Sequence, residues 1–203
     1  MKVRRGFTLI EMMISIAILA VLLGLAAPGF QTFIRNTQIR TTADSLQAGM
    51  QLARSEALRR NARVSFWLVS GIDAGCARTS AGTSWVVSID DPTGACNASI
   101  SNTVAPRLIQ TRLGSDGSSG ITINAVTGAL APAASSCITF NGFGTVEPVC
   151  PGGGAPIGRV SIVSTNSPNT TRDLQVRIAS GGSIRMCDPD VPSSDASYCG
   201  EEN

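Results

Sequence analysis

The chain contains no histidine, and Lys2 is its only lysine. Histidine-based catalysis and imidazole metal sites are therefore excluded by composition. The sequence also offers no nucleophile paired with a base, no phosphate-binding loop and no two carboxylates at a catalytic spacing. We expect a protein that is not an enzyme and that binds no cofactor and no metal.

Charge of either sign is also scarce, because only 15% of the residues are Asp, Glu, Lys or Arg, and the formal net charge is +2. Lys2, Arg4 and Arg5 lie at the amino end, and the rest of the chain carries 13 basic and 14 acidic side chains. A nearly neutral protein has no general attraction to polyanions.

A long apolar run follows the basic amino end. The 23 residues from Met12 to Ile34 are uncharged, and as a helix they would span roughly 35 Å, enough to cross a bilayer core. The positive-inside bias keeps the preceding basic residues in the cytoplasm. We expect a single-pass membrane protein with a cytoplasmic amino terminus and an exported domain.

Glu11 is a carboxylate at the start of this apolar helix. An acid at a bilayer centre costs about 2.5 to 3.5 kcal/mol on insertion scales and needs a partner. A cut between Gly6 and Phe7 would create an α-amino group about one helical turn from Glu11, on the same helix or on a neighbouring one.

The segment from Arg5 to Glu11, Arg-Gly-Phe-Thr-Leu-Ile-Glu, resembles the type IV prepilin leader. The resemblance implies that a prepilin peptidase cuts after Gly6 and methylates Phe7, and that Glu11 pairs with the amine of an adjacent subunit during filament assembly. Pro28 lies where many pilins have a kink. Residues 1–6 would then be the leader and residues 7–30 the membrane and assembly helix, first in the inner membrane and later in an extracellular filament or pseudopilus.

Two other interpretations of this end remain open. One is a secretory signal peptide, with an apolar core and small residues at Gly24-Leu25-Ala26 for cleavage. The other is a plain membrane anchor. The amino-terminal residue of the mature protein distinguishes them, because only the prepilin interpretation requires Phe7.

The exported part contains six cysteines, none in a C-x-x-C motif: Cys76, Cys96, Cys137, Cys150, Cys187 and Cys199. An even number in an oxidising compartment indicates disulfides, although six cysteines allow 15 pairings. We expect sequence neighbours to pair, Cys76 with Cys96, Cys137 with Cys150 and Cys187 with Cys199. A zinc site is the alternative, and the spacing disfavours it.

Residues 31–63 have the period of an amphipathic helix. One stripe contains Ile34, Ile39, Leu46, Met50, Ala53 and Ala57. Glu56 can reach Arg59 or Arg60 at helical offsets, and Asn61 is the expected end of this stem.

Residues 64–203 have the pattern of many short strands separated by glycine-rich turns. The expected strands are Val64–Val69, Trp85–Ile89, Arg107–Leu113, Ile121–Asn124, Ile138–Asn141, Arg159–Val163, Leu174–Ala179 and Ser183–Cys187. The predicted fold is therefore α+β, a long helix packed on an antiparallel β domain.

The stretch Leu46 to Val64, with its Ala-Arg-Ser-Glu-Ala run, resembles the GspH/FimT family of minor pilins and pseudopilins, as does Ile138-Thr-Phe140 followed by Gly142 and Gly144. The resemblance implies a low-abundance subunit of a type IV pilus or of a type II secretion pseudopilus, with other minor and major pilins or pseudopilins as partners. The sequence does not separate these two systems.

One branch of that family is implicated in DNA uptake through a Gly-Arg-x-Arg motif before a cysteine. In Gly181–Cys187, Arg185 matches the second arginine, whereas Ser183 replaces the first. Arg177 and Arg172 could extend a basic patch, but the acids that follow would repel DNA: Asp188, Asp190 and Asp195. DNA binding remains an alternative.

Overall fold

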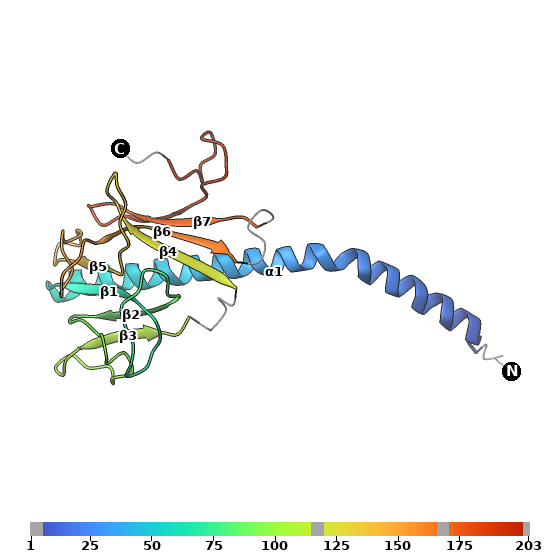
Figure 1. The fold of residues 1–203 in the computed structure, drawn as a ribbon, viewed down its shortest axis with the longest axis horizontal. Coiled ribbons are helices and arrows are strands. Elements are labelled where there is room, and N and C mark those ends of the chain that lie inside the picture. Colours follow the sequence, from blue (N-terminus) through green and yellow to red (C-terminus); the bar gives the residue numbers. More distant parts are fainter. Residues whose placement is uncertain (1–5, 115–119, 166–170, 201–203) are drawn as a thin grey trace.

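The computed structural model describes residues 6–114, 120–165 and 171–200, and it leaves out the side chains of residues 25–28. One long helix extends away from a β domain, which is built around the helix's carboxyl-terminal half (Figure 1). This arrangement confirms the predicted α+β fold, in which the helix packs on antiparallel strands.

The helix α1 spans Leu9–Arg60, 52 residues. It ends at Asn61, as predicted, because this residue adopts a left-handed conformation with φ 47° and ψ 44°. Among the described residues, no single helix is long and apolar enough to cross a membrane. Two parts of α1, Leu9–Gly24 and Gly29–Arg60, reach the required length and apolarity only when taken together, and they are bent by 41° relative to each other.

One face of α1 forms the centre of the core. Its fully buried residues are spaced three or four apart, as one helical face requires: Ile39, Ala43, Leu46, Met50, Ala53 and Ala57. Ile34 was expected on this stripe but is 40% exposed. The buried stripe therefore starts at Ile39, the first buried position of the helix.

All eight expected strands are present, with ends shifted by a few residues. The first sheet has the order β3-β2-β1-β5, and the second has the order β4-β6-β7-β8; every pairing is antiparallel. The strands are β1 (Val64–Val69), β2 (Ser84–Ser88), β3 (Leu108–Arg112), β4 (Ile121–Thr127), β5 (Cys137–Phe140), β6 (Ile157–Ser164), β7 (Leu174–Ile178) and β8 (Ile184–Cys187).

Both faces of β1 are buried, in two different clusters. Phe66 and Leu68 pack against α1 in the main core. Trp67 and Val69 point to the opposite face, where they meet two disulfides and the loops that carry them. The disulfide-linked loops thus form a second, smaller core on the face of the first sheet that points away from α1.

The cysteines form the three disulfides expected from the sequence: Cys76–Cys96, Cys137–Cys150 and Cys187–Cys199. The zinc alternative is therefore wrong, since all six sulfur atoms are used in S–S bonds. Among the described residues, no group of three or more acidic or cysteine side chains is arranged to hold a metal ion.

Ion pairs cover the end of α1. Glu56 accepts hydrogen bonds from Arg59 at 2.6 Å and from Arg60 at 2.7 Å, both of the pairings that helical spacing predicted. The hydrogen bond from Arg59 is the largest cause of the lowered pKa of Glu56. Arg63 pairs with Glu147 at 3.4 Å and links the end of the stem to the loop after β5.

Candidate functional site

The amino end of α1 is closed by a reciprocal capping box. The Glu11 backbone N–H donates to Thr8 Oγ1 at 3.3 Å, and the Thr8 backbone N–H donates to Glu11 Oε2 at 3.4 Å. The sequence interpretation missed Thr8, although Thr-x-x-Glu before an apolar run is the signature of this cap. Glu11 is therefore both an acid in an apolar helix and part of the helix start.

Gly6 and Phe7 precede the helix and are exposed, with Phe7 81% exposed. The peptide bond between them lies outside regular structure, where a peptidase can bind an extended substrate. The side chain of Pro28, also expected to matter in assembly, lies outside the described residues.

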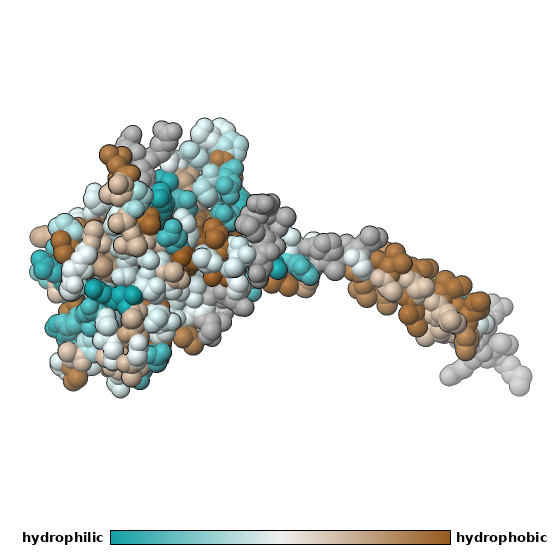
Figure 2. All heavy atoms as spheres, viewed as in Figure 1, coloured by the Kyte–Doolittle hydropathy of each residue, from teal (hydrophilic) through white to brown (hydrophobic). Residues whose placement is uncertain are grey.

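The amino-terminal half of α1 exposes an apolar surface, seen in Figure 2 as the brown end of the helix. Together with Phe7, which precedes the helix, the large exposed apolar side chains of this half are Leu9, Ile10, Met12, Met13, Ile14, Ile16, Ile18, Leu19, Val21, Leu22, Leu23, Phe30, Phe33 and Ile34. An apolar surface of this extent is unfavourable in water and indicates a membrane or protein partner.

The structure brings two of the three candidate DNA-binding arginines together. Arg177 on β7 and Arg185 on β8 are directly opposite in the antiparallel register, and Arg159 on β6 is opposite Arg177 on its other side. Opposed residues of neighbouring strands project from the same face. The three arginines therefore form a row across the second sheet, and Arg159 was missed because sequence alone does not give the register.

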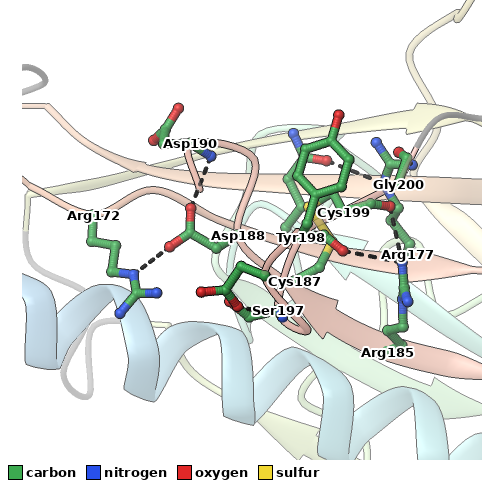
Figure 3. Close-up of a disulfide and its surroundings, with 12 residues drawn as sticks. Arg172, Arg177, Arg185, Cys187, Asp188, Asp190, Ser197, Tyr198, Cys199 and Gly200 are labelled. Carbon is green, nitrogen blue, oxygen red and sulfur yellow. Dashed lines mark hydrogen bonds and ion pairs between the residues drawn. A yellow bond between two sulfur atoms is a disulfide. The ribbon is translucent and has the colours of Figure 1, made fainter. Parts of the chain in front are cut away.

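Arg177 and Arg185 bind the backbone of the carboxyl-terminal segment (Figure 3). Arg177 Nη1 donates to Gly200 O at 2.8 Å, and Arg185 Nη2 donates to Cys199 O at 2.9 Å. Arg177 Nε also donates to Gln175 Oε1 at 3.3 Å. These acceptors are neutral, so the bonds orient the guanidinium groups without cancelling their charge.

Arg172 lies apart from this pair, beside α1. Its Nε donates to the buried carboxylate of Asp188, which raises the pKa of Arg172, and its backbone N–H donates to Asn36 Oδ1 at 3.0 Å. Figure 3 shows Arg172 at the opposite side of the view from Arg177 and Arg185. Its charge is thus compensated locally.

A groove of about 820 Å³ opens beside the arginine row. Its walls come from the ends of β4, β6 and β7 and from loops after β5 and before β6, and the carboxyl-terminal residues Cys199 and Gly200 close one side. Arg177 and Arg185 both line it.

Two family models match the chain. The model for type II transport protein GspH covers residues 42–182, and the model for the prokaryotic N-terminal methylation motif covers residues 1–27.

Among curated proteins, the chain is similar to fimbrial protein EcpC of Eikenella corrodens, with 33% identity over 112 residues, 54% of this chain and 71% of that protein. It is also similar to a fimbrial protein of Pseudomonas aeruginosa, with 37% identity over 65 residues, 32% of this chain and 42% of that protein.

Among solved structures, it is similar to the type IV minor pilin FimU of Pseudomonas aeruginosa, with 18% identity, a TM-score of 0.49 and coverage of 80% of this chain and 95% of that chain. The minor pseudopilin EpsH of the Vibrio cholerae type 2 secretion system has 12% identity, a TM-score of 0.44 and coverage of 76% and 99%.

Proposed function

This chain belongs to the GspH family of minor pilins and pseudopilins, and on that basis we propose that it is a minor subunit of a type IV pilus. It is made as a prepilin, cut after Gly6 and built into the filament through residues 7–30. The observation that carries the proposal is the amino end: an exposed Gly6–Phe7 bond lies about one turn before Glu11, ahead of a helix whose amino-terminal apolar side chains are exposed.

The proposed joint depends on a new charge. Cleavage would leave an ammonium group on Phe7, while the Glu11 carboxylate already accepts a weak 3.4 Å bond from Thr8 N–H. Exchanging this neutral donor for an ammonium group on a neighbouring subunit gives a stronger, charge-assisted bond in an apolar setting. The partners are the prepilin peptidase and other pilins.

Sequencing of the mature amino terminus tests the processing. We expect Phe7 with a methylated amine. A first residue near Ala27 would instead identify an ordinary signal peptide, and retention of Met1 would identify a plain anchor. Either result overturns the proposed joint.

Three substitutions separate charge from capping at Glu11. Glu11→Gln removes the charge but can still cap the helix, Glu11→Ala removes both, and Thr8→Ala weakens the cap while keeping the charge. We expect all three variants in the membrane fraction. Incorporation into sheared filaments should be lost for both Glu11 variants and kept for Thr8→Ala; normal incorporation of Glu11→Gln would refute the charge role.

We propose that the subunit begins as a single-pass inner-membrane protein with its β domain in the periplasm. The basic leader favours this orientation, and the three disulfides suit an oxidising compartment. A protease added to spheroplasts should cleave the β domain, whereas protection of that domain would contradict the orientation.

The pseudopilin of a type II secretion system is the main alternative, because it shares this amino end and this fold. The pilus is favoured by the curated relatives, which are fimbrial proteins. Deleting the gene should reduce surface pili and leave secreted protein levels unchanged. Retained pili with blocked secretion would establish the alternative.

DNA binding is a weaker candidate. The pairing of Arg177 with Arg185 supports it, but the charge of Arg172 is taken up by Asp188. Polyanion binding needs several uncompensated cations along the backbone path.

A further inference from the structure

The arginine row lies on the outer face of the second sheet. Val160 and Val176 point inward and belong to the main core around α1. Side chains alternate between the two faces of a strand, so Arg159, Arg177 and Arg185, at neighbouring strand positions, project away from the helix.

The arginine row is at the end of the molecule far from the exposed apolar half of α1. Val146 N–H donates to Ser180 O at 2.9 Å, and Arg54, near the last turn of α1, donates to Gly144 O at 2.9 Å. These contacts join the β7–β8 turn and the loop after β5, both of which line the groove, to the carboxyl end of α1. A partner in the groove would therefore approach from the membrane-distal side.

The electrostatics of the groove favour an anion. Within the described residues, the hydrogen bonds of Arg177 and Arg185 go only to neutral carbonyl and amide oxygens, and they use only some of the five N–H donors of each guanidinium. Glu147, an acid in the wall, is already paired with Arg63. Among residues 6–114, 120–165 and 171–200, no acid therefore neutralises the charge of these two arginines.

The shape of the groove favours a short chain over a long polyanion. Its volume lies within the range of about 300 to 1,000 Å³ typical of ligand sites. Away from the arginines its walls are largely apolar, with Ala129, Val146, Pro148, Pro156 and Ile178. A peptide segment can place a carboxylate on the arginines and apolar side chains on these walls, whereas a nucleic-acid backbone would place further charged phosphates against the apolar walls.

We propose that this groove binds an acidic, partly apolar peptide segment of a partner protein, with its carboxylate held by Arg177 and Arg185. The disulfide Cys187–Cys199 fixes the carbonyl groups that orient both guanidinium groups. The proposal goes beyond the pilus assignment, because a subunit of either filament system could present this surface.

The test uses the 203-residue chain in detergent and a fluorescein-labelled decapeptide that alternates Glu or Asp with Leu or Val. A second decapeptide with Gln and Asn in place of the acids is the matched probe. Fluorescence polarisation should show binding of the acidic decapeptide alone. Equal binding of the neutral one would overturn the proposal.

Substitutions locate the site. Arg185 is exposed, so Arg185→Gln should keep the fold and weaken binding about tenfold or more, the scale of a lost charge-assisted hydrogen bond. Arg185→Lys should restore part of the affinity. The control Arg112→Gln removes an exposed arginine of β3, on the other sheet, and should have no effect.

Two results would reject the groove as a peptide site. One is that Arg185→Gln binds the acidic decapeptide with unchanged affinity. The other is that a duplex DNA oligonucleotide binds the chain more tightly than the decapeptide does and that Arg185→Gln abolishes this DNA binding, which would make the row a nucleic-acid surface.

Discussion

Thr8 and Glu11 hold each other at the start of α1, each donating a backbone N–H to the side chain of the other. The carboxylate proposed to join neighbouring subunits is therefore engaged within its own chain before assembly. Assembly would exchange this neutral donor for an ammonium group, which compensates the charge that is costly in an apolar setting.

Thr8→Ala should fray the helix start. Losing an N-cap threonine costs about 1 kcal/mol, so the amides of the first turn should exchange with solvent several-fold faster in detergent. Hydrogen exchange followed by mass spectrometry measures this effect. The amides of Leu46 to Ala53 should be unchanged, because they are held by the core; faster exchange there would show that the cap acts beyond its own turn.

Gly49→Ala should destabilise the β domain. In an exposed helix this change would gain about 1 kcal/mol. Here the new Cβ would lie 2.8 Å from Phe66 Cε2 and 3.1 Å from the Trp85 ring, and overpacking a buried site costs about 1 to 3 kcal/mol. Thermal unfolding should show a lower Tm, whereas Gln51→Ala, at an exposed position of the same helix, should change it little.

Replacing Cys187 and Cys199 together by serine should lower the free energy of unfolding by about 2 to 4 kcal/mol. Neither cysteine belongs to an apolar cluster, in contrast to Cys76 and Cys96, which pack with Trp67. The near-ultraviolet signal of the tryptophans should therefore survive in the first double variant and change when Cys76 and Cys96 are replaced. A lost signal in both would show that the carboxyl-terminal disulfide also supports the core.

Asp173 should make stability fall with rising pH. Burial is the main cause of its raised pKa, followed by the charges of Asp190 and Asp188, and its buried Oδ1 has no hydrogen-bond partner among the described residues. The folded state therefore holds this proton at pH values where the unfolded chain has released it. The resulting stabilisation is present at acid pH and is lost as pH rises from the ordinary aspartate pKa through the raised one.

Asp173→Asn should remove that dependence. Denaturant unfolding at several pH values should show a smaller loss of stability above pH 4 in the variant than in the parent chain. Asp44→Asn, at an exposed position of α1, is the matched control. Parallel pH profiles for the parent and Asp173→Asn would contradict the assignment.

Local patterns predicted much of this architecture. The spacing of Leu46, Met50 and Ala53 predicted the buried helical face, and the helix ends at the expected residue, Asn61, whose left-handed conformation stops it locally. The strands were found from runs of β-branched and aromatic residues. Such features depend on neighbours in the chain, so they can be recognised without the fold.

The sequence by itself determined the apolar amino-terminal run and the order of the helix and strands, because each is written within a few dozen consecutive residues. Only the tertiary structure decided which arginines act together: strand register sets Arg177 opposite Arg185, whereas Arg172, which precedes β7, pairs with Asp188. Register depends on contacts between distant segments and on a shared core, so a slip of one residue would turn Arg177 or Arg185 to the other face.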